Sequence, residues 1–206
     1  MTRYGMVIDV TRCIGCNACS VACKKGNNTP EGVFWNRVET VGGDSPDCAS
    51  GTFGDSHLAF QPVSCQHCSS PACVAACPTG ASYIDEETGV VLVDYEECIG
   101  CESCIKACPY DVRHHNEGEP VFAVDIAFGD QGVQQHKAGA VEKCTFCHQR
   151  LSKGEAPNCM QLCPARARFF GDLDDPDSEV SKLVADNECE QLLAEEGTKP
   201  NVHYIV

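Results

Sequence analysis

The chain has 206 residues, of which eighteen are cysteines, and 30 acidic residues outnumber 15 basic ones. The length fits one or two ordinary domains. The acidic balance argues against a nucleic-acid partner, because phosphate binding requires a basic surface. So many cysteines first suggest a secreted, disulfide-stapled protein. We reject that interpretation because the cysteines fall into tight runs and because residues 1–9 contain neither an apolar signal segment nor a small-residue cleavage site.

No stretch approaches the ~18 consecutive apolar residues that a membrane-spanning helix requires, so no transmembrane span is predicted. We therefore expect the chain to begin in a reducing cytoplasm, where thiols can receive iron and sulfide.

A short strand is expected over residues 5–9, directly before the first cysteine run. This run is Cys13-x2-Cys16-x2-Cys19-x3-Cys23. Its spacing is that of bacterial ferredoxins, in which three cysteines hold one cubane and the fourth ligates another cluster. Lys24 stands where proline usually follows the fourth cysteine, so we expect the helix to end by other means, through Gly26 and the pair Asn27-Asn28.

Residues 30–64 are interpreted as an insertion that carries the only tryptophan, Trp35. A tryptophan is more often a core anchor than an electron relay. Residues 41–51 are rich in turn-forming residues and predict a loop. Cys48 lies in this loop, away from the ligand runs, and is expected to be a free thiol.

The second and third runs form the centre of the chain. They are Cys65-x2-Cys68-x4-Cys73-x3-Cys77-Pro78 and Cys98-x2-Cys101-x2-Cys104-x3-Cys108-Pro109. The third run matches the ferredoxin pattern without a mismatch. Gly100 lets the backbone wrap around a cubane, and each proline is expected to end the helical turn that carries the last cysteine away from its own loop. Residues 81–84 and 90–93 predict a hairpin that joins the two runs.

Three weaker segments precede the fourth run. His114 and His115 are expected in a solvated loop, because no carboxylate or cysteine lies at ligand spacing from them. A weak strand is predicted over residues 121–126, and residues 129–139 are interpreted as a connecting loop.

The fourth run is Cys144-x2-Cys147-x11-Cys159-x3-Cys163-Pro164. It repeats the paired cysteines and the ending before proline, with a stretched middle. Its start, with His148 after Cys147, also matches the C-x-x-C-H signature of covalent haem. We favour a cluster, because haem would leave Cys159 and Cys163 without a role. His148 is then an ordinary loop residue.

Residues 169–177 are expected to form a turn, and Ser178 is expected to cap a helix with Val180 on its apolar face. Cys189 is interpreted as a small buried hydrophobic residue in the continuation of this helix. Residues 202–206 predict a closing strand.

Sixteen of the eighteen cysteines thus form four runs of four, which fits four 4Fe-4S clusters. Zinc is the alternative, but structural zinc sites use two separated pairs of ligands, and these runs crowd more sulfur than that. The hairpin between runs two and three favours pairing them with each other and run one with run four. Pairing in chain order is the other arrangement. The favoured ligand sets are Cys13, Cys16, Cys19 with Cys163; Cys23 with Cys144, Cys147, Cys159; Cys65, Cys68, Cys73 with Cys108; and Cys77 with Cys98, Cys101, Cys104.

The predicted fold class is therefore α+β, with two interlocked ferredoxin-like two-cluster modules, long loops and small β-hairpins. One module comprises residues 1–64 plus 136–206, and the other residues 65–135.

The four ferredoxin-type runs, the segment from Glu142 to Cys147 and the segment from Gly171 to Pro176 resemble the iron-sulfur subunit of molybdopterin oxidoreductases of the dimethyl sulfoxide reductase type. The resemblance covers nearly the whole chain and implies the same pairing of runs. Related nitrate reductases place a tryptophan in the third run and hold a three-iron cluster there. This chain keeps Cys98, Cys101 and Cys104, so four cubanes are expected.

The resemblance implies an electron-transfer subunit that is not itself an enzyme. Its expected partner is a large catalytic subunit with a molybdenum or tungsten bis-pterin cofactor, with or without a quinone-binding membrane anchor. The complex is expected either in the cytoplasm or exported folded with that partner. A free polyferredoxin between soluble enzymes is the alternative.

Overall fold

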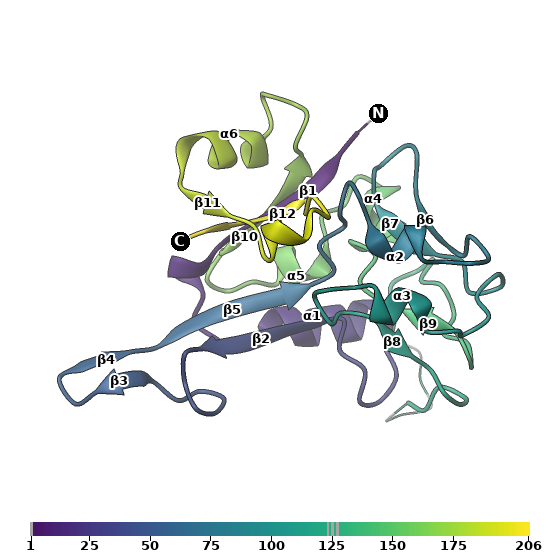
Figure 1. Cartoon of the computed structure of the whole chain (residues 1–206), viewed down its shortest axis with the longest axis horizontal. Coiled ribbons are helices and arrows are strands. Elements are labelled where there is room, and N and C mark those ends of the chain that lie inside the picture. The colour runs from purple at the N-terminus through teal and green to yellow at the C-terminus, as the bar shows by residue number, and fades with distance from the viewer. Residues whose placement is uncertain (1, 123, 125, 127) are drawn as a thin grey trace.

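The computed structural model describes residues 2–122, 124, 126 and 128–206. These residues form short helices and small sheets joined by long loops (Figure 1). The strands are β1 (Tyr4–Asp9), β2 (Asn36–Val41), β3 (Ser50–Thr52), β4 (Asp55–His57), β5 (Ala59–Ser64), β6 (Ser82–Ile84), β7 (Val91–Val93), β8 (His114–His115), β9 (Val141–Glu142), β10 (Arg168–Asp172), β11 (Cys189–Glu190) and β12 (Val202–Ile205). The helices are α1 (Ala18–Asn27), α2 (Ala72–Ala75), α3 (Ser103–Lys106), α4 (His148–Leu151), α5 (Asn158–Gln161) and α6 (Glu179–Asp186), with the 3-10 turns η1 (Val10–Arg12) and η2 (Ala194–Glu196).

A four-stranded sheet brings the two ends of the chain together, in the order β10-β1-β12-β11. β1 runs antiparallel to β10 and parallel to β12. Met6, Val7 and Ile8 on β1 are almost fully buried, because this strand has neighbours on both sides. The strands predicted at residues 5–9 and 202–206 are confirmed.

Helix α1 continues past Cys23 to Asn27 and ends without a proline. Asn28 adopts a left-handed conformation (φ 47°), and its amide donates to the carbonyl oxygens of Lys24 and Lys25. Asparagine tolerates this conformation better than most residues, so it can terminate a helix as glycine does. The predicted role of the Asn27-Asn28 pair is confirmed, whereas Gly26 lies inside the helix.

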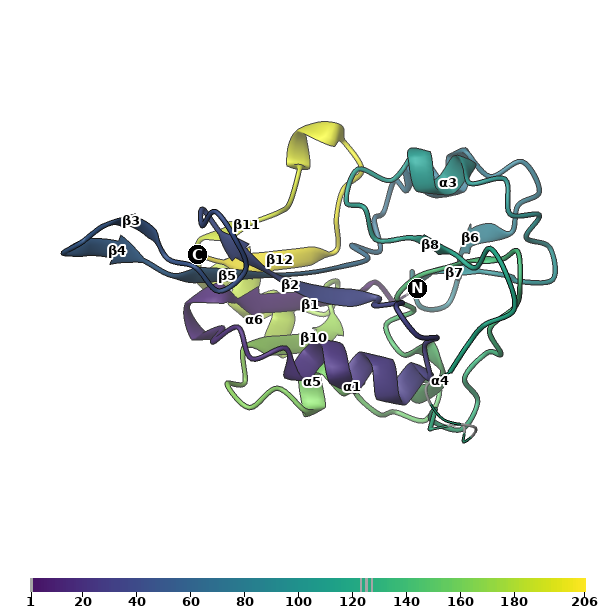
Figure 2. The ribbon, with the colours of Figure 1, turned by 90° about the horizontal axis from the view of Figure 1, so that it is seen from below.

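The insertion forms a long hairpin that projects from the rest of the molecule (Figures 1 and 2). β2 pairs antiparallel with β5, and β3 with β4 at the tip. The loop predicted over residues 41–51 is therefore too long, because Ser50 already belongs to β3. Trp35 is buried at the base of the hairpin, where its indole N–H donates to Glu142 Oε1 at 3.3 Å, which confirms its role as a core anchor.

The central hairpin is confirmed as β6 paired with β7. The short helices α2, α3 and α5 each end just before a Cys-Pro pair, and their C-cap residues are Ala76, Ala107 and Leu162. Proline disfavours the helical conformation in the residue before it, and this stops each helix at the same point.

Two local predictions were wrong because the pairing partners are distant in sequence. His114 and His115 form strand β8, which pairs with Glu142 and Val141 of β9, and do not lie in a solvated loop. Residues 169–172 belong to β10 and are not a turn, because β1 provides a partner. The expected strand at 121–126 includes positions 123 and 125, which lie outside the described residues.

The C-terminal helix is confirmed as α6. Ser178 Oγ accepts from the Ser181 amide at 3.1 Å, and Val180 is fully buried. Cys189 does not continue this helix; it lies half-buried in β11. No helix of the described residues combines the length and the apolar character needed to cross a bilayer.

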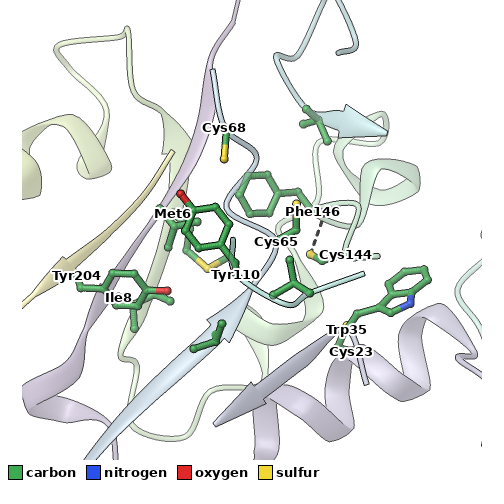
Figure 3. Packing of buried hydrophobic residues seen from close by; sticks show 14 of the residues in the cluster. Met6, Ile8, Cys23, Trp35, Cys65, Cys68, Tyr110, Cys144, Phe146 and Tyr204 are labelled. Carbon is green, nitrogen blue, oxygen red and sulfur yellow. Dashed lines mark hydrogen bonds between the residues drawn. The ribbon is translucent and has the colours of Figure 1, made fainter. Parts of the chain in front are cut away.

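The largest core cluster packs aromatic and aliphatic side chains around cysteine thiols. Figure 3 shows the Phe146 side chain beside Cys65, with a dashed line that joins Phe146 to the sulfur of Cys144, while Met6 and Tyr110 pack together in the same cluster. Cysteine thiols thus form part of the core itself.

Candidate functional site

Each of the eighteen cysteines is a free thiol in the structure, which contradicts a disulfide framework. Sixteen of them gather in four places, which we call groups I to IV. Group I is Cys13, Cys16, Cys19 and Cys163, which line one cavity. Group II is Cys23, Cys144, Cys147 and Cys159. Group III is Cys65, Cys68, Cys73 and Cys108, and group IV is Cys77, Cys98, Cys101 and Cys104, each set lining a cavity of its own.

Group II is defined by mutual proximity. Burial raises the pKa of Cys23 well above its ordinary value, and the neighbouring thiols of Cys144, Cys147 and Cys159 raise it further. The structure therefore brings Cys23 together with thiols of the fourth run. In the part of the chain that the structure describes, no three His, Cys, Asp or Glu side chains come close enough to hold a single metal ion.

The buried thiols have raised pKa values, so each must lose its proton before it can bind a metal. Burial raises the pKa of Cys68 to about 11 and that of Cys147 to about 12. A thiol with a raised pKa keeps its proton at neutral pH unless a cation displaces it. Binding of iron at these sites therefore releases protons.

Hydrogen-bond donors point at the sulfur atoms. The backbone amides of Ser82, Val141, Phe146 and Ala167 donate to Cys77, Cys98, Cys144 and Cys163, each at 3.4 Å. Asn27 Nδ2 adds a side-chain donor 3.4 Å from Cys23 Sγ. Such donors stabilise thiolates and tune the potential of an iron-sulfur cluster, so the residues present fit this group.

Neighbouring groups lie close to one another in a definite order. Burial and then the thiol of Cys65 raise the pKa of Cys144, which places group III beside group II. Burial raises the pKa of Cys159, Arg168 opposes this, and Cys19 adds to it, which places group II beside group I. The Arg113 guanidinium lies close to Cys104 of group IV as well as to group III. The order is IV, III, II, I.

The two ends of this series reach the surface. Cys16 in group I and Cys101 in group IV are exposed, whereas Cys144 and Cys65 of the inner groups are buried. The neighbouring side chains of Ile14 and Ile99 are 62% and 67% exposed. Both ends therefore combine an accessible thiol with an exposed apolar side chain.

Some residues of these sites were missed from the sequence. Asn27 was considered only as a helix terminator, yet its amide reaches Cys23. Arg113 and Arg168 were not considered at all. One signal was available: each is the fifth residue after the cysteine of a Cys-Pro pair, at Cys108 and at Cys163.

Comparison with known proteins agrees with this chemistry. Two sequence models described as 4Fe-4S dicluster domain match the chain, one over residues 56–124 and 130–173 and one over residues 12–81. The second match spans runs one and two, whereas the structure gathers run one with run four. We follow the structure for the grouping, because a sequence model matches a continuous stretch whatever its partners in space.

Three relatives align over almost the whole chain. A protein of Halobacterium salinarum, provisionally named as the iron-sulfur subunit of a dimethyl sulfoxide reductase, is 48% identical, over 100% of this chain and 79% of its own length. A subunit of the sulfite dehydrogenase of Allochromatium vinosum is 38% identical, over 100% and 83%. The arsenate respiratory reductase iron-sulfur subunit of a Shewanella species is 39% identical, over 98% and 96%.

The chain belongs to the iron-sulfur subunit family of the dimethyl sulfoxide reductase type. It contains two ferredoxin-like 4Fe-4S dicluster domains, and its function is electron transfer. This confirms the resemblance drawn from the cysteine runs.

Replacing Cys101 by serine tests the exposed end of the series. We expect a folded protein with a disturbed group IV site and slowed electron transfer, because this thiol is at the surface and its loss leaves the core intact. Iron content and turnover of the variant check this. Wild-type values for both would contradict it.

Proposed function

We propose that the sixteen cysteines of groups I to IV ligate four 4Fe-4S clusters, and that electrons pass along them in the order IV, III, II, I or in reverse. In this proposal the module of residues 1–64 plus 136–206 holds groups I and II, and the module of residues 65–135 holds groups III and IV, interlocked through run one with run four and run two with run three. The proximity of Cys65 to Cys144, which lie in one core cluster (Figure 3), is the observation that carries the proposal, because it links the two modules into one series.

The clusters, when bound, supply one-electron transfer without acid-base chemistry. The chain holds them close together and excludes water from the inner groups, while the outer groups remain accessible. Electrons can then enter at one end and leave at the other. Catalysis belongs to a partner, and the chain is a non-catalytic subunit.

The expected partner is a large subunit with a molybdenum or tungsten bis-pterin cofactor. The names of the relatives, which are reductase and dehydrogenase subunits, support this. The two exposed ends provide two docking points, and the second is available for a quinone-binding membrane subunit. The complex is assembled in the cytoplasm and either stays there or is exported folded.

Anaerobic purification of the native protein tests the proposal. We expect a large subunit containing molybdenum or tungsten and a pterin to co-purify in equal amount. A lone monomer that keeps all its clusters would instead support a free polyferredoxin carrier.

Variants of the two exposed isoleucines test which end of the series binds the partner, and each variant is the control for the other. We expect either Ile14→Glu or Ile99→Glu to release the pterin subunit while iron content stays unchanged, because a buried carboxylate at an interface is costly. If neither variant weakens the complex, the exposed ends are not the docking points.

A further inference from the structure

We propose that Arg113 and Arg168 set the reduction potentials of the clusters beside them, each as a fixed positive charge between the two thiol groups of one module. The inference rests on the proposed function, because it takes groups I to IV as cluster sites. It concerns two residues that no ligand pattern identifies.

Arg113 is buried in the cavity lined by group III, with 4% of its surface exposed. Its Nη1 donates to Ser82 Oγ at 3.0 Å. Its Nη2 is also buried and has no hydrogen-bond partner among the described residues. An unpaired buried guanidinium N–H is costly, so this atom indicates that the site accommodates a further acceptor. Cluster and thiolate sulfur atoms are such acceptors.

The titratable groups that raise the pKa of Arg113 are cysteine thiols. Burial lowers the pKa of Arg113, but Cys73 and Cys65 of group III and Cys104 of group IV raise it above its ordinary value. No carboxylate of the described residues forms a salt bridge with this guanidinium. The groups placed to balance its charge are therefore the thiols of the two neighbouring sites, once these lose their protons on binding a cluster.

Arg168 occupies the equivalent place in the other module. It lies on β10, is 3% exposed, and lines the cavity of group I. Its Nη2 donates to Asn36 Oδ1 at 2.8 Å, which fixes the guanidinium. Cys159 of group II and Cys19 of group I lie close enough to raise its pKa against the effect of burial.

The same construction thus occurs twice, each time at the fifth residue after the cysteine of a Cys-Pro pair. Reduction adds one electron to a cluster, with no bond broken and no proton required. A nearby positive charge stabilises the reduced form more than the oxidised form, so it raises the potential. Because both arginines are buried, salt screens this effect very little.

Redox titrations followed by electron paramagnetic resonance test the proposal in the whole complex. In Arg113→Met we expect the ratio of reduced to oxidised cluster at groups III and IV to fall about tenfold at a fixed ambient potential, which equals a decrease of about 59 mV for a one-electron couple. Groups I and II keep their wild-type potentials. Arg168→Met shows the reverse pattern, so each variant is the control for the other.

Two further variants separate charge from structure. Arg113→Lys keeps the positive charge, so we expect the potentials of groups III and IV in this variant to lie close to the wild-type values. Lys182→Met removes an exposed cation from α6, and we expect it to leave every potential unchanged. Unchanged potentials in both methionine variants, with all clusters present, would overturn this inference and leave the proposed function standing.

If the methionine variants lose iron, a measurement on the wild-type protein tests the inference instead. Pulsed electron paramagnetic resonance on protein with isotope-labelled arginine should detect a guanidinium nitrogen coupled to a reduced cluster. Absence of that coupling overturns the inference. Wild-type protein without four clusters overturns the proposed function together with it.

Discussion

Replacing Cys144 by serine is expected to remove the group II cluster and to slow electron transfer by more than about 100-fold. Loss of a residue outside the ligand shell already costs about 10–100-fold, and Cys144 is a proposed ligand. Its thiol lies in the largest core cluster, so no water replaces it easily. Group II also lies between groups III and I, so its loss interrupts the whole series. Iron content and turnover of the purified complex measure the effect.

Cys48→Ser is the matched control. This thiol is exposed on the projecting hairpin, where its nearest polar neighbour is Ser45 Oγ at 2.9 Å, and it belongs to no group. We expect wild-type iron content and turnover. Equal iron content in Cys144→Ser and Cys48→Ser would contradict the assignment of group II.

Replacing Glu142 by alanine is expected to destabilise the protein by about 3–5 kcal/mol, the cost of breaking a buried charge pair. Its fully buried carboxylate accepts from Trp35 Nε1 at 3.3 Å, Asn116 Nδ2 at 2.9 Å and His136 Nδ1 at 2.5 Å. Glu142 thus joins the projecting hairpin, strand β9 and the loop before it. The denaturant midpoint of cluster loss, followed by visible absorption, measures the effect.

Glu39→Ala is the control for this variant. Its partner is Arg37, and their side chains are 50% and 36% exposed, so we expect a loss of about 0–1 kcal/mol. Similar midpoints for the two variants would show that the buried network does not stabilise the fold.

The Glu142 network also predicts a dependence on pH. Burial opposes protonation of His136, but the Glu142 carboxylate raises the pKa of His136 above its ordinary value. A raised pKa in the folded state adds stability below about pH 6.5, and this stability is lost as the pH rises through the folded-state value. We therefore expect Glu142→Gln to cost more at about pH 6 than at about pH 9. An equal cost at both would exclude a charged pair.

Local patterns in the sequence predicted much of this structure. Cysteine spacing identified the thiols that the structure gathers, and the hairpin of β6 and β7 followed from strand and turn residues within one short segment. The cap at Ser178 was also readable, because its partner Ser181 is three residues away. In each case the interacting residues are near neighbours in sequence.

The missed features depend on distant partners. Strand β10 was taken for a turn because its partner β1 lies at the other end of the chain, where Tyr4 stacks on Phe170. His114 was assigned to a solvated loop because its partner, Glu142, follows much later. A single arginine such as Arg113 carries no local signal of burial. The one available signal is that Arg168 occupies the same position relative to a Cys-Pro pair.

Quantification of iron and acid-labile sulfide in anaerobically purified protein tests the central claim most directly. Four cubane clusters predict about sixteen irons and about sixteen sulfides per chain. Fewer than about twelve irons, or zinc in place of iron, would contradict the account.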